Sequence, residues 1–264
     1  MATESSHIAT SSGELSGRRA VVTGGSRGIG AAIVRSLLDA GATVVTSARG
    51  ETPHTPPGAA FVTADLSTSD GVRDFADTAL ELLGGVDIVV NNAGGCRSFQ
   101  SVLELENDWQ YTMDINFLAA VRLNAALVPA MRESGGGGAI IHVSSIATVA
   151  AYPNLLHYAA AKSALETYSK GLSAELAPDG IRVISVCLGN VETPASEIAR
   201  TRIVELHGGD PDDLTGQWAA EIPLGRLGEP QDIADAVSFL VSPRASWITG
   251  SNVVIDGGKT ASLC

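Results

Sequence analysis

Two kinds of segment alternate along most of this chain, and this alternation is the strongest constraint on its fold. Short runs rich in β-branched residues predict strands at Ala20–Thr23, Thr43–Thr46, Ala60–Thr63, Asp87–Val90, Ala139–Val143, Ile181–Val186 and Asn252–Ile255. Between most of them, apolar residues recur with helical spacing at Ile29–Leu38, Val72–Leu83, Leu103–Met131, Tyr158–Leu176 and Ile233–Leu240. Such alternation is typical of an α/β fold, in which helices cover both faces of a parallel sheet. We therefore expect a doubly wound sheet of about seven parallel strands.

The 264 residues divide into one domain and a short tail. No Pro/Gly-rich linker and no internal repeat interrupts the alternation, so we predict a single domain over residues 18–264. Residues 1–17 are rich in Ser and Thr without periodicity and are expected to form a flexible N-terminal tail. The prolines between Arg49 and Ala60 exclude a regular helix there, and the run Gly135–Gly138 indicates a surface turn.

Composition excludes several classes of protein. Lys and Arg number 17 against 29 Asp and Glu, a net charge of −12, which disfavours nucleic acid or an anionic membrane as partner. No apolar run approaches the roughly 20 residues that span a bilayer. The N-terminus lacks the apolar core of a secretory signal, and Cys96, Cys187 and Cys264 do not form a disulfide framework. We expect a cytoplasmic protein without a metal site.

The first chemical signal is a glycine-rich turn between the first strand and the first helix. It reads Thr23-Gly24-Gly25-Ser26-Arg27-Gly28-Ile29-Gly30, and the helical pattern follows at once. Glycines let the backbone approach a ligand closely, and the free N–H groups of a helix N-terminus favour phosphate. The turn therefore predicts a dinucleotide site. A passive turn is the alternative, but the position after the first strand favours the phosphate site.

A second signal combines a serine, a tyrosine and a lysine. Tyr158 and Lys162 are four residues apart and so share one helical face. A positive charge beside a phenol favours the phenolate, so Lys162 is expected to lower the pKa of Tyr158. Ser145, at the end of the fifth strand, precedes Tyr158 by thirteen positions; its neighbour Ser144 is the residue with which it could be confused.

From Arg18 to about Gly258 the chain resembles the short-chain dehydrogenase/reductase family, whose nucleotide motif is Thr-Gly-x-x-x-Gly-x-Gly and whose helix carries Tyr-x-x-x-Lys. The resemblance implies a Rossmann-like fold and catalytic roles for Asn116, Ser145, Tyr158 and Lys162. Asn116 is then expected at a local helix distortion, holding a water that relays protons to Lys162. The cofactor-binding residues implied or indicated are Gly24, Ser26, Arg27, Gly28, Ile29, Gly30, Arg49, Asp65, Leu66, Asn92, Ala93, Gly94, Tyr158, Lys162, Gly189, Val191 and Thr193.

The charge near the end of the second strand indicates which nicotinamide cofactor binds. Ala48 stands where NAD-dependent relatives carry Asp, and Arg49 follows it. With Arg27 this makes two guanidinium groups and no carboxylate, which suits the 2′-phosphate of NADP(H) better than the free ribose of NAD(H). Two solvated surface arginines are the alternative. Leu188-Gly189 replaces the Pro-Gly usual in relatives, which puts the rigidity of that turn in doubt.

These features together predict an NADP(H)-dependent oxidoreductase that transfers a hydride between nicotinamide and a ketone or secondary alcohol, with reduction as the expected direction. One alternative is a reductase of carrier-protein-bound 3-oxoacyl chains. Gly136 and Asp179 stand where such enzymes can carry Arg. The absence of these two basic residues disfavours the binding of an acidic carrier protein. A non-catalytic NADP-binding regulator or scaffold is the alternative from another class. Such members usually lose the Tyr or the Lys, and this chain keeps both.

The remaining predictions concern the substrate and the assembly. Residues 194–221 are expected to cover the substrate as a lid, with an ordinary packed helical hairpin as the alternative. His142 is expected to be a satisfied core histidine. The long helices from Leu103 and Tyr158 carry apolar residues on more than one face, which predicts a homo-oligomer, dimer or tetramer. Residues expected by position to form the pocket wall are Cys96, Phe99, Tyr152, Asn154 and His157.

Overall fold

A computed structural model describes residues 13–96, 99, 101, 103, 108–150 and 152–261. One sheet of seven parallel strands forms its centre, in the order β3-β2-β1-β4-β5-β6-β7. The strands are β1 Arg19–Thr23, β2 Thr43–Ala48, β3 Ala60–Thr63, β4 Ile88–Asn91, β5 Gly138–Ser145, β6 Ile181–Leu188 and β7 Asn252–Ile255. The predicted doubly wound parallel sheet is confirmed, and each predicted strand is present within two residues of its expected ends.

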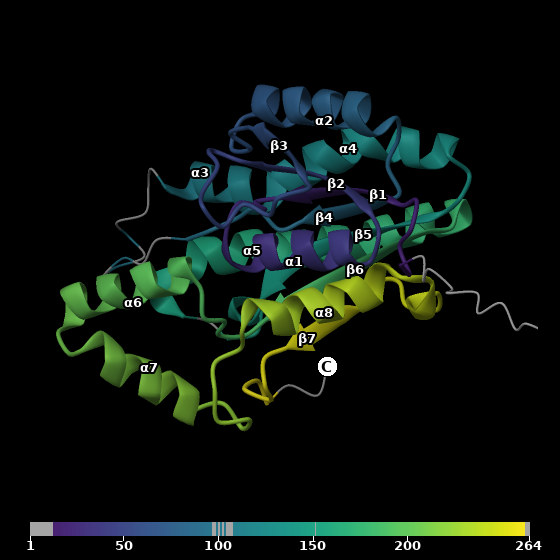
Figure 1. Cartoon of the computed structure of the whole chain (residues 1–264). Coiled ribbons are helices and arrows are strands. Elements are labelled where there is room, and N and C mark those ends of the chain that lie inside the picture. The colour runs from purple at the N-terminus through teal and green to yellow at the C-terminus, as the bar shows by residue number, and fades with distance from the viewer. Residues whose placement is uncertain are drawn as a thin grey trace, which may run out of the picture.

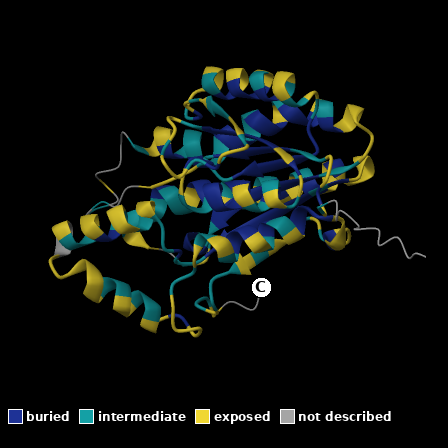
Figure 2. Ribbon diagram, viewed as in Figure 1, coloured by how far each residue is buried: buried dark blue, intermediate teal, exposed yellow. Residues whose placement is uncertain are grey.

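Helices cover both faces of the sheet (Figure 1). They are α1 Gly28–Asp39, α2 Ser69–Leu83, α3 Asp108–Met113, α4 Ala119–Glu133, α5 Leu156–Leu176, α6 Pro194–His207, α7 Pro211–Ala220 and α8 Pro230–Val241. One core packs α1 and α8 against the sheet, and a second core packs α2 and α4 against the opposite face. Neighbouring strand residues alternate between the two cores, as Val21 and Val22 do, because side chains along a strand point to opposite faces. Figure 2 shows the strands as the buried layer between half-exposed helices.

The order of the strands places the candidate site. The chain runs outward in one direction through β2 and β3, and in the other through β4 to β7. The reversal lies between β1 and β4, where the loops after these strands diverge. In open α/β sheets, ligands bind outside the carboxyl ends of the strands at such a reversal. The glycine-rich turn follows β1 at this point.

Two elements differ from the expectation. The predicted helix Leu103–Met131 begins only at Asp108 among the described residues, and it widens into a π-helical turn over Asp114–Leu118 before continuing as α4. Part of the predicted tail packs on the body: Leu15 is 2% exposed within the core under α1, and its N–H donates to Ala40 O at 2.8 Å. Periodicity is a weak signal over so short a stretch. Residues 1–12 lie outside the described part.

Two features are absent from the described residues. No helix there is long and apolar enough to cross a membrane. No group of three or more His, Cys, Asp or Glu there is arranged to hold a metal ion.

Candidate active site

The glycine-rich turn leaves the end of β1 in a conformation that only glycine can supply. Gly24 has a φ of +73°, and its N–H donates to Ser47 O on β2 at 2.7 Å. A Cβ on Gly30 would lie 2.1 Å from Gly24 O, so α1 packs directly on the turn. α1 begins at Gly28 without an acidic residue in its first turn and without a side-chain cap. Its first N–H groups are therefore open to an anion.

The segment after β4 is bound to this turn. The Asn92 side chain donates to Thr23 O at 2.8 Å, and Thr23 Oγ1 accepts the N–H groups of Asn92 and Ala93, both at 2.9 Å. A Cβ on Gly24 would lie 3.0 Å from Asn92 Nδ2. The loops after β1 and β4 thus form one rigid floor for the crevice.

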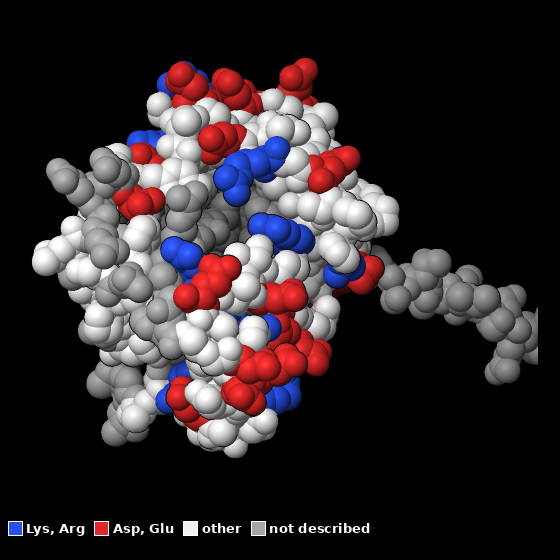
Figure 3. All heavy atoms as spheres, turned by 90° about the vertical axis from the view of Figure 1, so that its left-hand side faces the viewer, with Lys and Arg blue, Asp and Glu red and all other residues white. Residues whose placement is uncertain are grey.

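Basic side chains border the crevice. Arg27 and Arg49 are exposed, and neither forms an ion pair with a described carboxylate. Arg49 is close enough to Asp65 to lower the pKa of that carboxyl, although the hydroxyl of Ser67, which donates to Asp65 Oδ1 at 2.7 Å, has the larger effect. Figure 3 faces this side of the molecule and shows a hollow with Lys and Arg side chains at its rim. Leu66, by contrast, is 4% exposed and belongs to the core.

The π-helical turn carries Asn116, which is buried. Its Nδ2 donates to Gly95 O at 2.8 Å, and its Oδ1 accepts the Gly95 N–H at 3.0 Å. A Cβ on Gly94 would lie 2.6 Å from Asn116 Oδ1 and 3.3 Å from Lys162 Nζ. These two side chains therefore border one small space. π-turns inside α-helices occur frequently at functional sites, and the predicted helix distortion at Asn116 is present.

Ser145 and Tyr158 meet at the carboxyl end of β5. The Ser145 hydroxyl lies close enough to Tyr158 to favour the phenolate, and so acts to lower the pKa of Tyr158. Ser144 points elsewhere, because its hydroxyl donates to Glu166 Oε1 at 2.5 Å. The structure therefore pairs Ser145, not Ser144, with the tyrosine. Lys162 Nζ donates to Val143 O at 2.8 Å and lies 5.7 Å from the centre of the Tyr158 ring.

The expected effect of Lys162 on Tyr158 is wrong for this structure. Burial raises the pKa of Tyr158, and this effect outweighs the opposing effect of the Ser145 hydroxyl. Burial also lowers the pKa of Lys162 to about 8. The sequence argument counted the neighbouring charge but not the loss of water around both groups, and desolvation disfavours each charged form. Lys162 is therefore the member of this pair that titrates near neutral pH.

The loop after β6 closes the crevice from the other side. Gly189 packs so tightly on β7 that an added Cβ would lie 2.7 Å from Asp256 Cα. Val191 is 8% exposed and belongs to the core, whereas Thr193 caps α6 with a hydroxyl that accepts the Ser196 N–H at 3.0 Å. A Cβ on Gly28 would lie 3.6 Å from Thr193 Cβ. Two predicted cofactor-binding segments that are far apart in sequence therefore face one another.

Several known proteins are similar to this chain over most of its length. The model of a family described as enoyl-(acyl carrier protein) reductase matches residues 24–260, which is most of the chain. The chain belongs to the short-chain dehydrogenase/reductase family. The human dehydrogenase/reductase SDR family member 4 is 36% identical over 259 residues, which cover 94% of this chain and 90% of that protein. The 3-oxoacyl-[acyl-carrier-protein] reductase of Chlamydia pneumoniae is 33% identical over 255 residues, covering 93% and 98%.

A solved structure of the family shows the same architecture. L-sorbose reductase from Gluconobacter frateurii, in complex with NADPH and L-sorbose, superposes with a TM-score of 0.86 at 34% identity, covering 94% of this chain and 98% of the other. The likeness extends over the whole short-chain dehydrogenase/reductase domain and is not limited to the glycine-rich turn.

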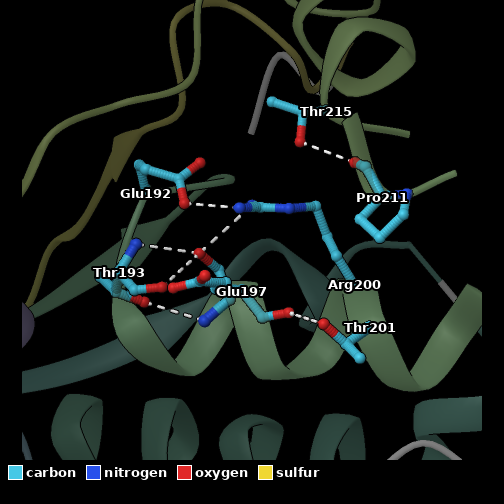
Figure 4. Close-up of polar contacts among 8 residues, drawn as sticks. Glu192, Thr193, Glu197, Arg200, Thr201, Pro211 and Thr215 are labelled. Carbon is cyan, nitrogen blue, oxygen red and sulfur yellow. Dashed lines mark hydrogen bonds and ion pairs between the residues drawn. The ribbon is translucent and has the colours of Figure 1, made fainter. Parts of the chain in front are cut away.

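Residues 194–221 of this short-chain dehydrogenase/reductase form two helices, α6 and α7, which extend from the body beside the crevice (Figure 1). Arg200 on α6 is 7% exposed, and its Nη2 donates to Glu192 Oε1 at 2.6 Å (Figure 4). The Arg200 guanidinium also lies 5.9 Å from the centre of the Trp218 ring on α7. Arg200 therefore connects α6 and α7 to the loop that carries Val191 and Thr193.

Sequence reasoning missed this ion pair. Glu192 and Arg200 are eight residues apart across a loop and a helix start, a spacing without a recognised meaning. The capping signal Thr193-Pro194, which fixes where α6 begins, could have placed Arg200 two turns along a helix. Nothing in the sequence indicated that its charged head is buried.

The predicted pocket-wall residues differ in their surroundings. Cys96 is close enough to both Lys162 and Tyr158 to interact with them electrostatically. His157 instead packs edge-on against Phe99 at 5.6 Å and against Trp109 at 6.2 Å between ring centres. Its ring nitrogens have no hydrogen-bond partner among the described residues. For Tyr152 and Asn154, the pocket-wall role stays a prediction.

His142 is only partly satisfied within the core. Its Nε2 lies 2.8 Å from Asn124 Nδ2, but its Nδ1 has no partner among the described residues. Burial lowers the pKa of His142 to about 3, so the ring is neutral at physiological pH.

Proposed function

We propose that this chain is an NADP(H)-dependent reductase of ketone carbonyls, which interconverts a ketone and a secondary alcohol. The observation that carries the proposal is the meeting of Ser145, Tyr158, Lys162 and Asn116 at the crevice beside the glycine-rich turn. These four groups would form a route for one proton: the hydroxyls of Ser145 and Tyr158, the Lys162 amine, whose pKa is lowered to about 8, and the buried amide of Asn116. The names of the relatives, which are reductases and dehydrogenases, support this activity.

The residues of the crevice fit NADP(H). The turn Gly24–Gly30 and the uncapped start of α1 would hold the pyrophosphate. Arg27 and Arg49, which have no ion-pair partner among the described residues, would hold the 2′-phosphate. Asp65, whose Oδ1 accepts two bonds from Ser67, would accept the adenine amino group on Oδ2. Leu66 can contribute only its backbone, because its side chain is in the core.

On the nicotinamide side, Lys162 would hold the ribose, while Val191 and Thr193 would meet the carboxamide. When bound, the reduced nicotinamide supplies a hydride. The L-sorbose reductase neighbour, solved with NADPH, supports this choice of cofactor.

The catalytic residues of the chain then supply the proton and fix the carbonyl. Tyr158 donates its phenolic proton to the oxygen that gains charge as the carbonyl is reduced. Ser145 donates a hydrogen bond to the same oxygen and stabilises its charge. Lys162 returns a proton to Tyr158. Asn116 borders a cavity of about 10 Å³ with Thr23 and Asn91, a space that suits one water. Asn116 also borders the space beside Gly94 with Lys162, and would pass a proton between that water and the lysine.

The experiment that tests this function is a substrate panel. The purified protein and NADPH are mixed with small ketones and ketoses, L-sorbose among them, and loss of NADPH absorbance is followed. We expect turnover of at least one ketone, and Tyr158→Phe should abolish it while leaving NADPH binding intact. Tight NADPH binding without turnover across the panel would favour the non-catalytic regulator instead.

The carrier-protein alternative has one observation against it. An acidic carrier protein needs a basic landing surface. Asp179 stands where such enzymes can carry Arg. Its carboxylate also forms an ion pair with Arg132, with 2.7 Å between Oδ2 and Nε, and so neutralises a nearby positive charge. We therefore expect free ketones to be reduced at least as efficiently as a carrier-bound 3-oxoacyl chain.

We further propose a cytoplasmic homo-oligomer assembled through α4 and α5. α5 exposes a stripe of small residues that would allow a second helix to approach closely. They are Ala160, Ser163, Thr167, Gly171 and Ala174. We also propose that α6 and α7 form a lid that moves over the substrate.

A further inference from the structure

A pocket lies at the opposite edge of the sheet from the active site. It has a volume of about 150 Å³ and is bordered by the amino ends of β1, β4, β5 and β6 and by the segment after α8. β5 spans eight residues, so the pocket lies roughly 20 Å from the crevice at about 3.3 Å per residue. Ligands of open α/β sheets bind at the carboxyl ends of the strands. Nothing in the proposed reduction uses this pocket.

The charge inside this amino-end pocket is positive. Arg18 and Arg182 line it together with one carboxylate, Asp87. Both oxygens of Asp87 are occupied by Arg19, whose Nε and Nη2 donate to them at 2.9 and 3.1 Å. Arg18 is left with a long contact to Asp87 Oδ1 at 3.8 Å. The pocket therefore holds excess positive charge in a protein whose net charge is −12.

Arg182 is a partly buried cation without a counter-ion. Its Nη1 donates to the backbone oxygens of Leu240 at 2.7 Å and Ile248 at 3.4 Å, and its Nη2 donates to that of Ser242 at 3.1 Å. It forms no ion pair with a described carboxylate, and burial lowers its pKa. A guanidinium carries five N–H donors, so its Nε–H and one Nη2–H remain without a described partner. Withdrawing a charge from water is unfavourable unless an opposite charge approaches it.

The glycine run supplies further donors to the same space. Gly136 and Gly137 line the pocket, and their N–H groups donate to no described residue. Gly137 has a φ of +66°, a conformation that turns successive N–H groups toward one side. A Cβ on Gly136 would lie 3.8 Å from Arg18 Nη1. Two guanidinium groups and two backbone N–H groups without a described acceptor therefore border one small volume.

We propose that the amino-end pocket binds a phosphate group between Arg18, Arg182 and the N–H groups of Gly136 and Gly137. Phosphate matches this set because it accepts several hydrogen bonds at once and carries close to two negative charges, one for each guanidinium. The ligand is either free phosphate or the phosphate of a phosphorylated small molecule. The site is separate from the crevice proposed for NADP(H), so both can be filled together.

The test measures thermal unfolding of the full chain saturated with NADPH, which keeps phosphate out of the crevice. Inorganic phosphate is titrated at constant ionic strength, balanced with NaCl. At a phosphate concentration ten times the Kd, one bound phosphate should raise Tm by about 3 °C. Arg18→Gln should reduce this shift strongly, and Arg73→Gln, an exposed arginine on α2, should leave it unchanged. Binding should also broaden the ³¹P resonance of free phosphate in the wild type and in Arg73→Gln, and broaden it much less in Arg18→Gln.

A second pair of variants keeps the test independent of Arg18. Gly136→Asp places a carboxylate beside Arg18 and should abolish the phosphate shift, whereas the isosteric Gly136→Asn should retain it. An equal shift in all variants, or no shift in the wild type, would overturn the proposal. A second arm with glycerol 3-phosphate identifies the source: a larger shift than with inorganic phosphate assigns the site to a phosphorylated metabolite, and an equal or smaller one to the free ion.

Discussion

At the scale of single residues, Lys162 governs how the activity should depend on pH. Burial lowers its pKa from 10.5 to about 8, so Lys162 loses its proton just above neutral pH. The lysine must be protonated to resupply Tyr158 during reduction. We expect reductive kcat/KM to be level below pH 8 and to fall about tenfold for each pH unit above it.

Initial rates over pH 6 to 10 with NADPH and an active ketone measure this profile. The oxidative direction should show the opposite trend, because it needs the deprotonated couple. Lys162→Met should remove the break near pH 8 along with most of the activity. A break at the same pH in that variant would assign it to another group.

A second residue-scale prediction concerns the absence of a side chain at Gly94. A methyl group there would lie 2.6 Å from Asn116 Oδ1, closer than real Cβ contacts, so Asn116 and Lys162 would have to move. Displacements of this size at a catalytic group reduce turnover by roughly 10- to 100-fold. We expect Gly94→Ala to lower kcat by that factor with little change in Tm.

The next residue provides the control for this substitution. A Cβ on Gly95 meets nothing within 4 Å among the described residues. Gly95→Ala should therefore keep nearly full activity. Equal losses in the two variants would show that backbone freedom, and not space beside Asn116, is what matters there.

At the scale of secondary-structure elements, the ion pair between Glu192 and Arg200 should connect α6 and α7 to cofactor binding. Arg200 is buried, whereas the Glu192 side chain is 44% exposed. Removing Arg200 breaks the contact between the second turn of α6 and Glu192, beside Thr193. We expect Arg200→Met to weaken NADPH binding several-fold, measured by fluorescence titration.

A double-mutant cycle isolates the pair. If the ion pair is responsible, Glu192→Gln should weaken binding in the wild type and have little further effect in Arg200→Met. Arg202→Gln, on the same helix but paired with Glu205 at 3.0 Å on the surface, is the control and should bind NADPH normally. Additive losses in the cycle would mean that the two residues act separately.

The elements also show how far sequence reasoning reaches. The strands were predictable because a sheet covered on both faces requires continuous β-branched runs. The shared helical face of Tyr158 and Lys162 followed from their spacing, whereas Ser145 and the catalytic roles came from the family resemblance and stay predictions. The π-turn at Asn116 was not predictable from periodicity, since one inserted residue per turn leaves the apolar pattern nearly unchanged. The pKa values of Tyr158 and Lys162 depend on burial, which only the folded chain defines.

At the scale of the whole molecule, the exposed face of α5 should decide the state of assembly. Apolar or small residues on both sides of a helix are expected where one side packs on the body and the other on a second copy. Gly171 lies on the outer side, where an added Cβ would meet nothing within 4 Å of the described chain. A substitution there changes the assembly surface without disturbing the packing of a single copy.

We therefore expect Gly171→Glu to dissociate the oligomer and Gly171→Ala to retain it. A carboxylate between two closely packed helices is desolvated and faces its own symmetry mate, whereas a methyl group is small and raises helix propensity. Light scattering at micromolar concentration should give a multiple of 27.0 kDa for the wild type and Gly171→Ala, and a smaller assembly for Gly171→Glu. A wild-type monomer would contradict the predicted homo-oligomer, and an unchanged mass in Gly171→Glu would move its interface away from α5.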